Sequence, residues 1–405
     1  MPSALPDGDP VPADGSLPDS ALAGAAARTL SIYLHVPFCA TRCGYCDFNT
    51  YTSGELGSAT STQSWYDAAL AEIDLAAQVL GTDRVVDTVF VGGGTPSLIG
   101  AEMLGGLLRR IGERFGLAAG AEVTTEANPE STDPRLLAGL REAGYTRLSL
   151  GMQSVAPGVL ATLDRVHTPG RALQVVDWAR QAGFDHLNLD LIYGTPGETD
   201  QQFADSLTAA VTAGVDHVSA YSLIVEPGTA MARKVRSGRL PAPAEDVLAD
   251  RYLLAEEMLS GNGFGWYEVS NWARGEQAAC RHNLAYWRGG DWWGVGPGAH
   301  SHVGGVRWWN VKHPHAYAAA LAAGRSPGHA REVLDQPARR IEEILLRLRL
   351  SEGLPTRLLS PAGRRQAAQE AADGLLDPAA LAAGSAVLTL RGRLLADGIA
   401  VRLLD

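Results

Sequence analysis

The sequence has little positive charge and no long hydrophobic run. Its 34 Lys and Arg residues stand against 45 Asp and Glu residues, and the net charge of −11 disfavours a protein that binds nucleic acid through its phosphates. The longest apolar runs, such as residues 316–323, are much shorter than the roughly 20 residues that a membrane-spanning helix needs. We therefore expect neither a nucleic-acid partner nor a transmembrane segment.

Cysteine is also scarce. Three of the four cysteines, Cys39, Cys43 and Cys46, lie within eight positions, too close together for a disulfide to close a useful loop. The fourth, Cys280, is distant in the sequence. This distribution excludes a secreted disulfide framework and favours a metal or cluster site in a reducing compartment, so we expect a cytoplasmic protein.

The N-terminal segment lacks the features of a signal peptide. Residues 1–28 contain five prolines and four aspartates and have no positive charge before Arg28. This composition predicts a disordered tail over residues 1–28.

The sequence is 46% hydrophobic, and its pattern after residue 28 predicts an α/β fold. From Leu30 onward, short aliphatic segments alternate with longer segments of helical period, which is typical of βα units and a parallel sheet. The predicted strands are 31–36, 87–91, 122–126, 147–152, 186–192 and 217–222, and the predicted helices between them include 63–79, 101–115 and 201–213. Six units are two short of a closed barrel, so we predict an incomplete (β/α)6 barrel over residues 29–260.

The βα rhythm fades after residue 228, although 244–260 predicts one more helix. Residues 261–325 form a segment rich in Trp and His. Residues 326–405 predict a smaller, mainly helical C-terminal domain, with helices at 338–350 and 364–373 and a strand and turn at 387–393.

The cysteines form a C-x3-C-x2-C motif directly after the first predicted strand. Three thiolates on a short loop can hold three irons of a cubane cluster and leave the fourth iron open. The alternative is a structural zinc with Cys280 or a histidine as fourth ligand, but zinc sites usually combine two C-x2-C halves. We favour the cluster.

Further motifs follow the other strands: GGGTPS, TTEANPE, SLGMQS, LDRVHT and NLDLIYGTPGET. Together with IYLHVPFCATRCGYCDF, they resemble the radical S-adenosylmethionine (SAM) superfamily, and within it the oxygen-independent coproporphyrinogen oxidase branch. The resemblance implies a 4Fe-4S cluster on Cys39, Cys43 and Cys46, with SAM chelating the fourth iron through its amino and carboxylate groups. It also implies reductive cleavage of SAM to a 5′-deoxyadenosyl radical.

The residue types at the predicted strand ends suit SAM, because its carboxylate needs donors and its ammonium and hydroxyls need acceptors. By resemblance, the SAM-binding residues are Tyr33, Tyr45, Gly93, Gly94, Thr95, Glu126, Gln153, Arg165, Asp190 and His300. Taken singly, each residue has a plainer interpretation: the glycines as a tight turn, the carboxylates as a solvated rim, and the arginine as a surface ion pair.

Two features separate the chain from the coproporphyrinogen-oxidising enzyme. That enzyme's pattern continues with a further cysteine, where this sequence has Phe48. The chain also contains an H-N-x-x-Y-W motif, with His282, Tyr286 and Trp287, which resembles a haem-chaperone branch of the family. Cys280, two residues earlier, is a rival haem ligand.

The composition around this motif suits a porphyrin and its iron. Seven of the nine tryptophans lie between positions 266 and 309, with His282, His300 and His302 among them. A small aromatic subdomain with hydrogen-bonded histidines is the alternative. By resemblance, we also expect residues 291–298 to fold back over the cluster.

Two functional hypotheses follow. The first is a haem chaperone that binds a 4Fe-4S cluster, SAM and haem and delivers haem to acceptor proteins. Respiratory, membrane-bound acceptors, a haem donor protein, a homodimer and a peripheral position at the inner face of the membrane belong to this hypothesis. The second is an oxygen-independent coproporphyrinogen III oxidase, which decarboxylates the propionates of its substrate oxidatively.

Overall fold

The computed structural model describes residues 7–56, 60–165 and 167–404 of the chain. Six parallel strands form its centre and pair in sequence order. They are β1 (Leu30–Val36), β2 (Val86–Gly93), β3 (Leu117–Ala127), β4 (Arg147–Gln153), β5 (His186–Tyr193) and β6 (His217–Ser222). All six predicted strands are thus present.

Further strands extend the sheet at both edges, giving twelve strands within the described residues. At the β6 edge, β8 (Asn271–Ala273) and β7 (Gly265–Glu268) follow in antiparallel pairing. At the β1 edge, β9 (Asp291–Val295) pairs in parallel. The antiparallel strands β10 (His300–Val303), β11 (Val306–Asn310) and β12 (Gly328–Val333) continue from it. The Trp/His-rich segment is therefore built into the main sheet rather than being a separate unit.

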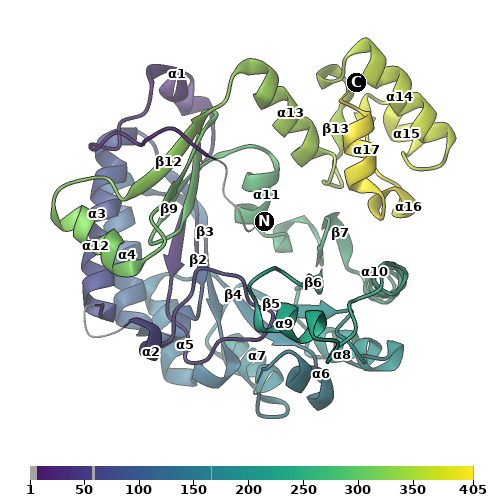
Figure 1. Cartoon of the computed structure of the whole chain (residues 1–405), viewed down its shortest axis with the longest axis horizontal. Helices are drawn as coiled ribbons and strands as arrows, with labels where there is room; N and C mark the ends of the chain where they lie inside the picture. The colour runs from purple at the N-terminus through teal and green to yellow at the C-terminus, as the bar shows by residue number, and fades with distance from the viewer. Residues whose placement is uncertain (1–6, 57–59, 166, 405) are drawn as a thin grey trace.

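Helices cover the outer face of the curved sheet (Figure 1). The longer ones are α3 (Thr62–Leu80), α4 (Gly100–Phe115), α5 (Pro134–Ala143), α7 (Arg171–Gln181), α8 (Asp200–Thr212), α10 (Glu245–Ser260) and α12 (Pro314–Ala322). In α4, Leu104, Leu107, Leu108 and Ile111 are buried at helical spacing, each contributing roughly 1.5–3 kcal/mol. A capping box of Thr199 and Gln202 begins α8, as its Thr-Asp sequence predicts.

Short helices connect these elements. They are α1 (Asp19–Leu22), α2 (Ser53–Leu56), α6 (Pro157–Thr162), α9 (Ala230–Arg236) and α11 (Arg281–Trp287). Single 3-10 turns are η1 (Ala25–Ala27), η2 (Pro96–Leu98), η3 (Pro129–Ser131) and η4 (Glu276–Ala278).

The N-terminal segment differs from its prediction. Its first six residues lie outside the described part of the chain, but residues 7–28 are packed against the sheet. Asp9 pairs with Arg331 through two backbone hydrogen bonds of 2.8 Å, and Ala21 is fully buried. Arg28 forms an ion pair with the buried Asp291 at 2.9 Å. These contacts join residues about 300 positions apart in the sequence, so the proline-rich composition of the segment could not predict them.

The C-terminal helices form a lobe of their own (Figure 1). They are α13 (Gln336–Arg347), α14 (Pro361–Ala372), α15 (Pro378–Ala382), α16 (Leu390–Arg393) and α17 (Ala396–Arg402), with the 3-10 turn η5 (Thr356–Leu358) and the strand pair β13 (Leu354–Pro355) and β14 (Ser385–Ala386). A separate core cluster lies within residues 344–403. The strand and turn predicted at 387–393 are wrong, because the Thr389 side chain caps a short helix there. Among the described residues, no helix is long and apolar enough to span a membrane.

Candidate functional site

The cysteine loop follows β1 and is held against the loop after β2. Gly94 N–H donates to Val36 O at 2.7 Å, and Thr95 N–H donates to Phe38 O at 2.8 Å. A Cβ atom at Gly94 would lie 2.4 Å from the Phe38 oxygen. The glycine run is thus more than an ordinary tight turn, because it allows the two loops to touch.

The three clustered cysteines are half-buried on this loop. The Arg165 guanidinium lies 3.4 Å from Cys43 Sγ, and the Thr95 hydroxyl lies 3.9 Å from Cys39 Sγ. Burial raises the pKa of Cys46 to about 11. Donors directed at sulfur atoms stabilise thiolates, so the loop fits a cluster held by three cysteines.

The zinc alternative receives no support from Cys280. Its thiol is buried beside Glu122, with 3.5 Å between Sγ and Oε1, and is not part of the cysteine loop.

Three of the predicted SAM-binding residues, Tyr33, Glu126 and Asp190, line one cavity of about 150 Å³ inside the barrel. Gly93 N–H donates to Glu126 at 3.1 Å, while Asn188 donates to Asp190 at 2.8 Å. Desolvation by the surrounding protein and the nearby Asp190 charge raise the pKa of Glu126 to about 8. The two carboxylates are therefore interior acceptors and not a solvated rim.

Arg165 and Gln153 lie next to each other at the end of β4. Arg165 donates to Gly151 O at 3.0 Å, and a Cβ at Gly151 would lie 2.8 Å from both the Arg165 guanidinium and the Gln153 amide. Gln153 has a φ of +66°, which is rare outside glycine and common at ligand sites. Since Arg165 contacts Cys43 and the β4 backbone, it is not one half of a surface ion pair. Tyr45 is packed nearby, in the loop that carries the cysteines.

His300 lies elsewhere in the sheet. It is in β10, where its ring stacks on Trp309 with 6.0 Å between ring centres, and it does not line the interior cavity. The segment before it contacts the loop that follows the cysteines: Asn49 donates to Pro297 O at 2.9 Å.

The H-N-x-x-Y-W motif forms α11, and His282 and Tyr286 line the same cavity as Tyr33, Glu126 and Asp190. The sequence did not predict that this motif and the SAM-binding candidates line the same cavity. Trp287 is outside this lining and half-buried.

His282 is only 1% exposed, and both of its ring nitrogens have partners. Nδ1 lies 2.8 Å from the Thr88 hydroxyl, and Nε2 lies 2.8 Å from the Tyr286 hydroxyl. Phe90 packs on the ring with 5.2 Å between centres. Burial lowers the pKa of His282 to about 4, so its imidazole is neutral.

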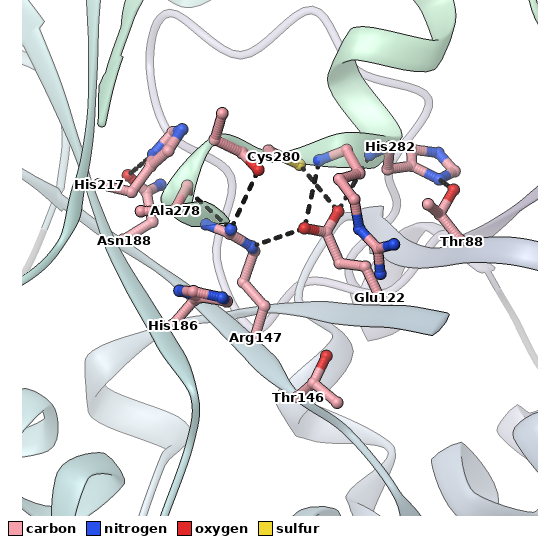
Figure 2. A network of polar contacts seen from close by, with 12 residues as sticks. Thr88, Glu122, Thr146, Arg147, His186, Asn188, His217, Ala278, Cys280 and His282 are labelled. Carbon is pink, nitrogen blue, oxygen red and sulfur yellow. Dashed lines mark hydrogen bonds and ion pairs between the residues drawn. The ribbon is translucent and has the colours of Figure 1, made fainter. Parts of the chain in front are cut away.

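Two further side chains that the sequence reasoning missed hold α11 in place (Figure 2). Arg147 and Glu122 form an ion pair at 3.1 Å and are 1% and 4% exposed. Burial works to raise the pKa of Glu122, but Arg147 and the N–H groups of His282 and Arg281 outweigh it and lower that pKa. The alternation Glu122-x-Thr124-x-Glu126 is the signal that could have placed Glu122 on the interior face of its strand.

Comparisons with known proteins place the chain in a family. The sequence model of the Radical SAM superfamily matches residues 33–210. The chain is 57% identical over 383 residues to "Heme chaperone HemW" of Mycobacterium tuberculosis, covering 95% of this chain and 97% of that protein. The chain belongs to the HemW family.

More distant relatives agree with this assignment. The HemW of Bacillus subtilis is 33% identical over 326 residues, covering 80% of this chain and 84% of that protein. The solved structure of coproporphyrinogen III oxidase (HemN) from Escherichia coli has a TM-score of 0.81 at 24% identity, covering 96% of this chain and 94% of that one. That match confirms the radical SAM fold, with its partial barrel and C-terminal domain, while the HemW relatives define the branch.

Proposed function

We propose that this protein is a haem chaperone, which binds haem and transfers it to acceptor proteins. The observation that carries the proposal is the 57% identity to a haem chaperone over nearly the whole chain. The H-N-x-x-Y-W motif of α11 supports it, since an imidazole, a phenol and an indole together suit a haem.

The cofactors of this chaperone are a 4Fe-4S cluster and SAM. Cys39, Cys43 and Cys46 hold the cluster, which supplies an electron and an open iron when bound. The contacts of the two loops after β1 and β2 support this site, because they place Thr95 and Arg165 beside the cysteines.

SAM would be held at the carboxyl ends of the strands. Glu126 and Asp190 would accept hydrogen bonds from its ammonium and hydroxyl groups, and Arg165 would donate to its carboxylate. The backbone of Gly93 and Gly94 would border its methionine portion. The remaining SAM-binding residues are Tyr33, Tyr45, Thr95, Gln153 and His300, the last from β10.

The acceptors are respiratory proteins, including membrane-bound ones. The free cysteine loop fits a reducing cytoplasmic compartment. The proposal also includes peripheral association with the inner face of the membrane, a haem donor protein and a homodimer.

Haem titration of the anaerobically reconstituted full chain tests the proposal. Haem should bind with a distinct absorption spectrum, and His282→Ala should weaken binding or change the ligand-field bands while the cluster remains. His329→Ala is the matched control, because His329 is an exposed histidine outside the motif. Haem binding no tighter than to an unrelated acidic protein would contradict a chaperone.

A turnover assay separates the chaperone from the oxidase. Given SAM and an electron donor, the reconstituted protein should not convert coproporphyrinogen III over many turnovers. Phe48, at the position of the oxidase's additional cysteine, is 61% exposed and offers no ligand. Sustained formation of the divinyl product would replace the chaperone assignment with the oxidase.

A further inference from the structure

The haem motif lies on a strap that crosses the barrel. We call residues 274–290, between β8 and β9, the strap. Its first neighbour, β8, pairs with β6, and its second neighbour, β9, pairs with β1. The strap therefore leaves the six parallel strands at one edge and returns at the other, passing over the barrel interior.

Glu122 and Arg147 hold the centre of the strap by its backbone (Figure 2). Arg147 donates to Ala278 O at 2.7 Å. Glu122 accepts from Arg281 N–H at 3.2 Å and from His282 N–H at 3.0 Å. These contacts tie the strap to β3 and β4, in the middle of the sheet.

The strap's outer end is held more weakly. Arg288 pairs with Glu352 of the C-terminal lobe at 2.6 Å, but both side chains are more than 40% exposed. An exposed pair contributes about 0–1 kcal/mol, whereas removing one partner of a buried pair costs about 3–5 kcal/mol. The contacts of Glu122 and Arg147 therefore hold the strap more strongly than this exposed pair does.

His282 does not fit haem in this arrangement. Both ring nitrogens are hydrogen-bonded, and the cavity beside the ring holds about 150 Å³. Pockets for drug-sized ligands hold roughly 300–1,000 Å³, and a porphyrin is at least as large. The motif therefore predicts haem binding at a place where the closed barrel has no room for haem.

We propose that Glu122 and Arg147 form a latch that keeps the strap closed over the barrel. In this proposal, His282 becomes available to haem only when the strap moves away from β3 and β4. This inference rests on the proposed function. Gly275 and Gly289, with φ of +81° and +70°, flank the moving part as turning points. Opening breaks the contact of His282 Nδ1 with the Thr88 hydroxyl of β2, whereas Tyr286 is part of the strap and moves with it.

The latch lowers the apparent haem affinity, because only the open fraction of the protein can bind. A variant that weakens the latch should bind haem more tightly. Two donors face each carboxylate oxygen of Glu122, so Glu122→Gln is suitable, because its NH2 group cannot accept from the two donors at the position that it takes.

Hydrogen exchange of the full-length, cluster-loaded protein tests the latch without haem. In Glu122→Gln, the backbone amide of Arg281 or of His282, whichever faces the new NH2 group, should exchange at least about tenfold faster, the scale of losing a hydrogen bond to a charged group. Alkylation of the buried Cys280, located by peptide mass spectrometry, should accelerate as well. Exchange in β5 should stay at the wild-type rate.

Two further variants make the result specific. Glu370→Gln removes a buried carboxylate that pairs with Arg402 in the C-terminal lobe, and it should leave strap exchange unchanged. If Glu122→Gln does not fold, Glu122→Leu combined with Arg147→Met replaces the pair with apolar side chains, which is often tolerated. A folded variant whose strap exchanges at the wild-type rate overturns the latch.

Haem addition to the wild-type protein supplies the second arm. Haem should accelerate exchange of Arg281 and His282, and Glu122→Gln should bind haem at least about threefold more tightly. Haem binding that requires His282 while the strap stays fully protected overturns the latch. Absence of any haem binding instead overturns the proposed function, and the haem-free measurements still decide whether the latch exists.

Discussion

Glu72 gives the sharpest stability prediction, because its buried carboxylate joins three parts of the fold. It lies on α3, is 1% exposed, and accepts from Tyr317 OH at 2.6 Å, Gly296 N–H at 2.8 Å and Asn310 Nδ2 at 2.8 Å. Gly296 belongs to the segment that contacts the loop after the cysteines. Burial, opposed by these donors, raises the pKa of Glu72 from 4.5 to about 7.

The sign and size of the pH effect follow from this shift. The folded state binds the proton more tightly than the unfolded chain does, so the stabilising contribution is complete below pH 4.5 and is lost as the pH rises to about 7. A difference of 7 − 4.5 = 2.5 units corresponds to about 3 kcal/mol, at 1.36 kcal/mol per unit. Glu72 therefore lowers the free energy of unfolding by about 3 kcal/mol between these pH values.

Urea denaturation at pH 5 and at pH 8, followed by tryptophan fluorescence, measures this contribution. Trp293 and Trp308 lie in the same region and report on its packing. In Glu72→Gln the group stays neutral, so the difference in unfolding free energy between wild type and variant should change by about 2.5 kcal/mol from pH 5 to pH 8. A difference that is constant from pH 5 to pH 8 would refute the reasoning.

Three further predictions concern the cofactors and the C-terminal lobe. Replacing the three clustered cysteines by Ser should abolish the visible absorption of the cluster, checked with iron and sulfide analysis. Glu126→Gln and Asp190→Ala should each weaken SAM binding about tenfold or more in calorimetry, with the cluster intact. Arg393→Gln should lower the free energy of unfolding by about 1–3 kcal/mol, because the guanidinium pairs with Glu256 at 2.8 Å and lies 4.2 Å over the Trp266 ring.

The parallel strands could be predicted because each carries a dense apolar pattern of its own. Leu148 and Leu150 in β4 and Leu189 and Leu191 in β5 are all fully buried, on the face of the sheet that the helices cover. The edge strands could not be predicted in this way. Trp272 in β8 is fully buried and pairs with β6, which is distant in the sequence, and its segment has no βα rhythm.

The site follows the same division. The cysteine spacing and the Gly92–Thr95 turn are local features, so the sequence located them after β1 and β2. The position of His282 inside the barrel is not local, because it depends on Thr88 and Phe90 from β2. A sequence motif can indicate which residues suit haem, but it cannot indicate that another part of the chain already occupies them.

Charged residues within buried strands were the most informative exceptions to the patterns. An apolar pair at Glu122 and Arg147 would satisfy the barrel core, since transferring two charges from water costs several kcal/mol per ion before their attraction offsets it. An apolar pair could not, however, accept the N–H groups of Arg281 and His282 or donate to the carbonyl of Ala278. The charges of Glu122 and Arg147 therefore position the strap by binding its backbone groups. They are not explained by a contribution to the stability of the barrel core.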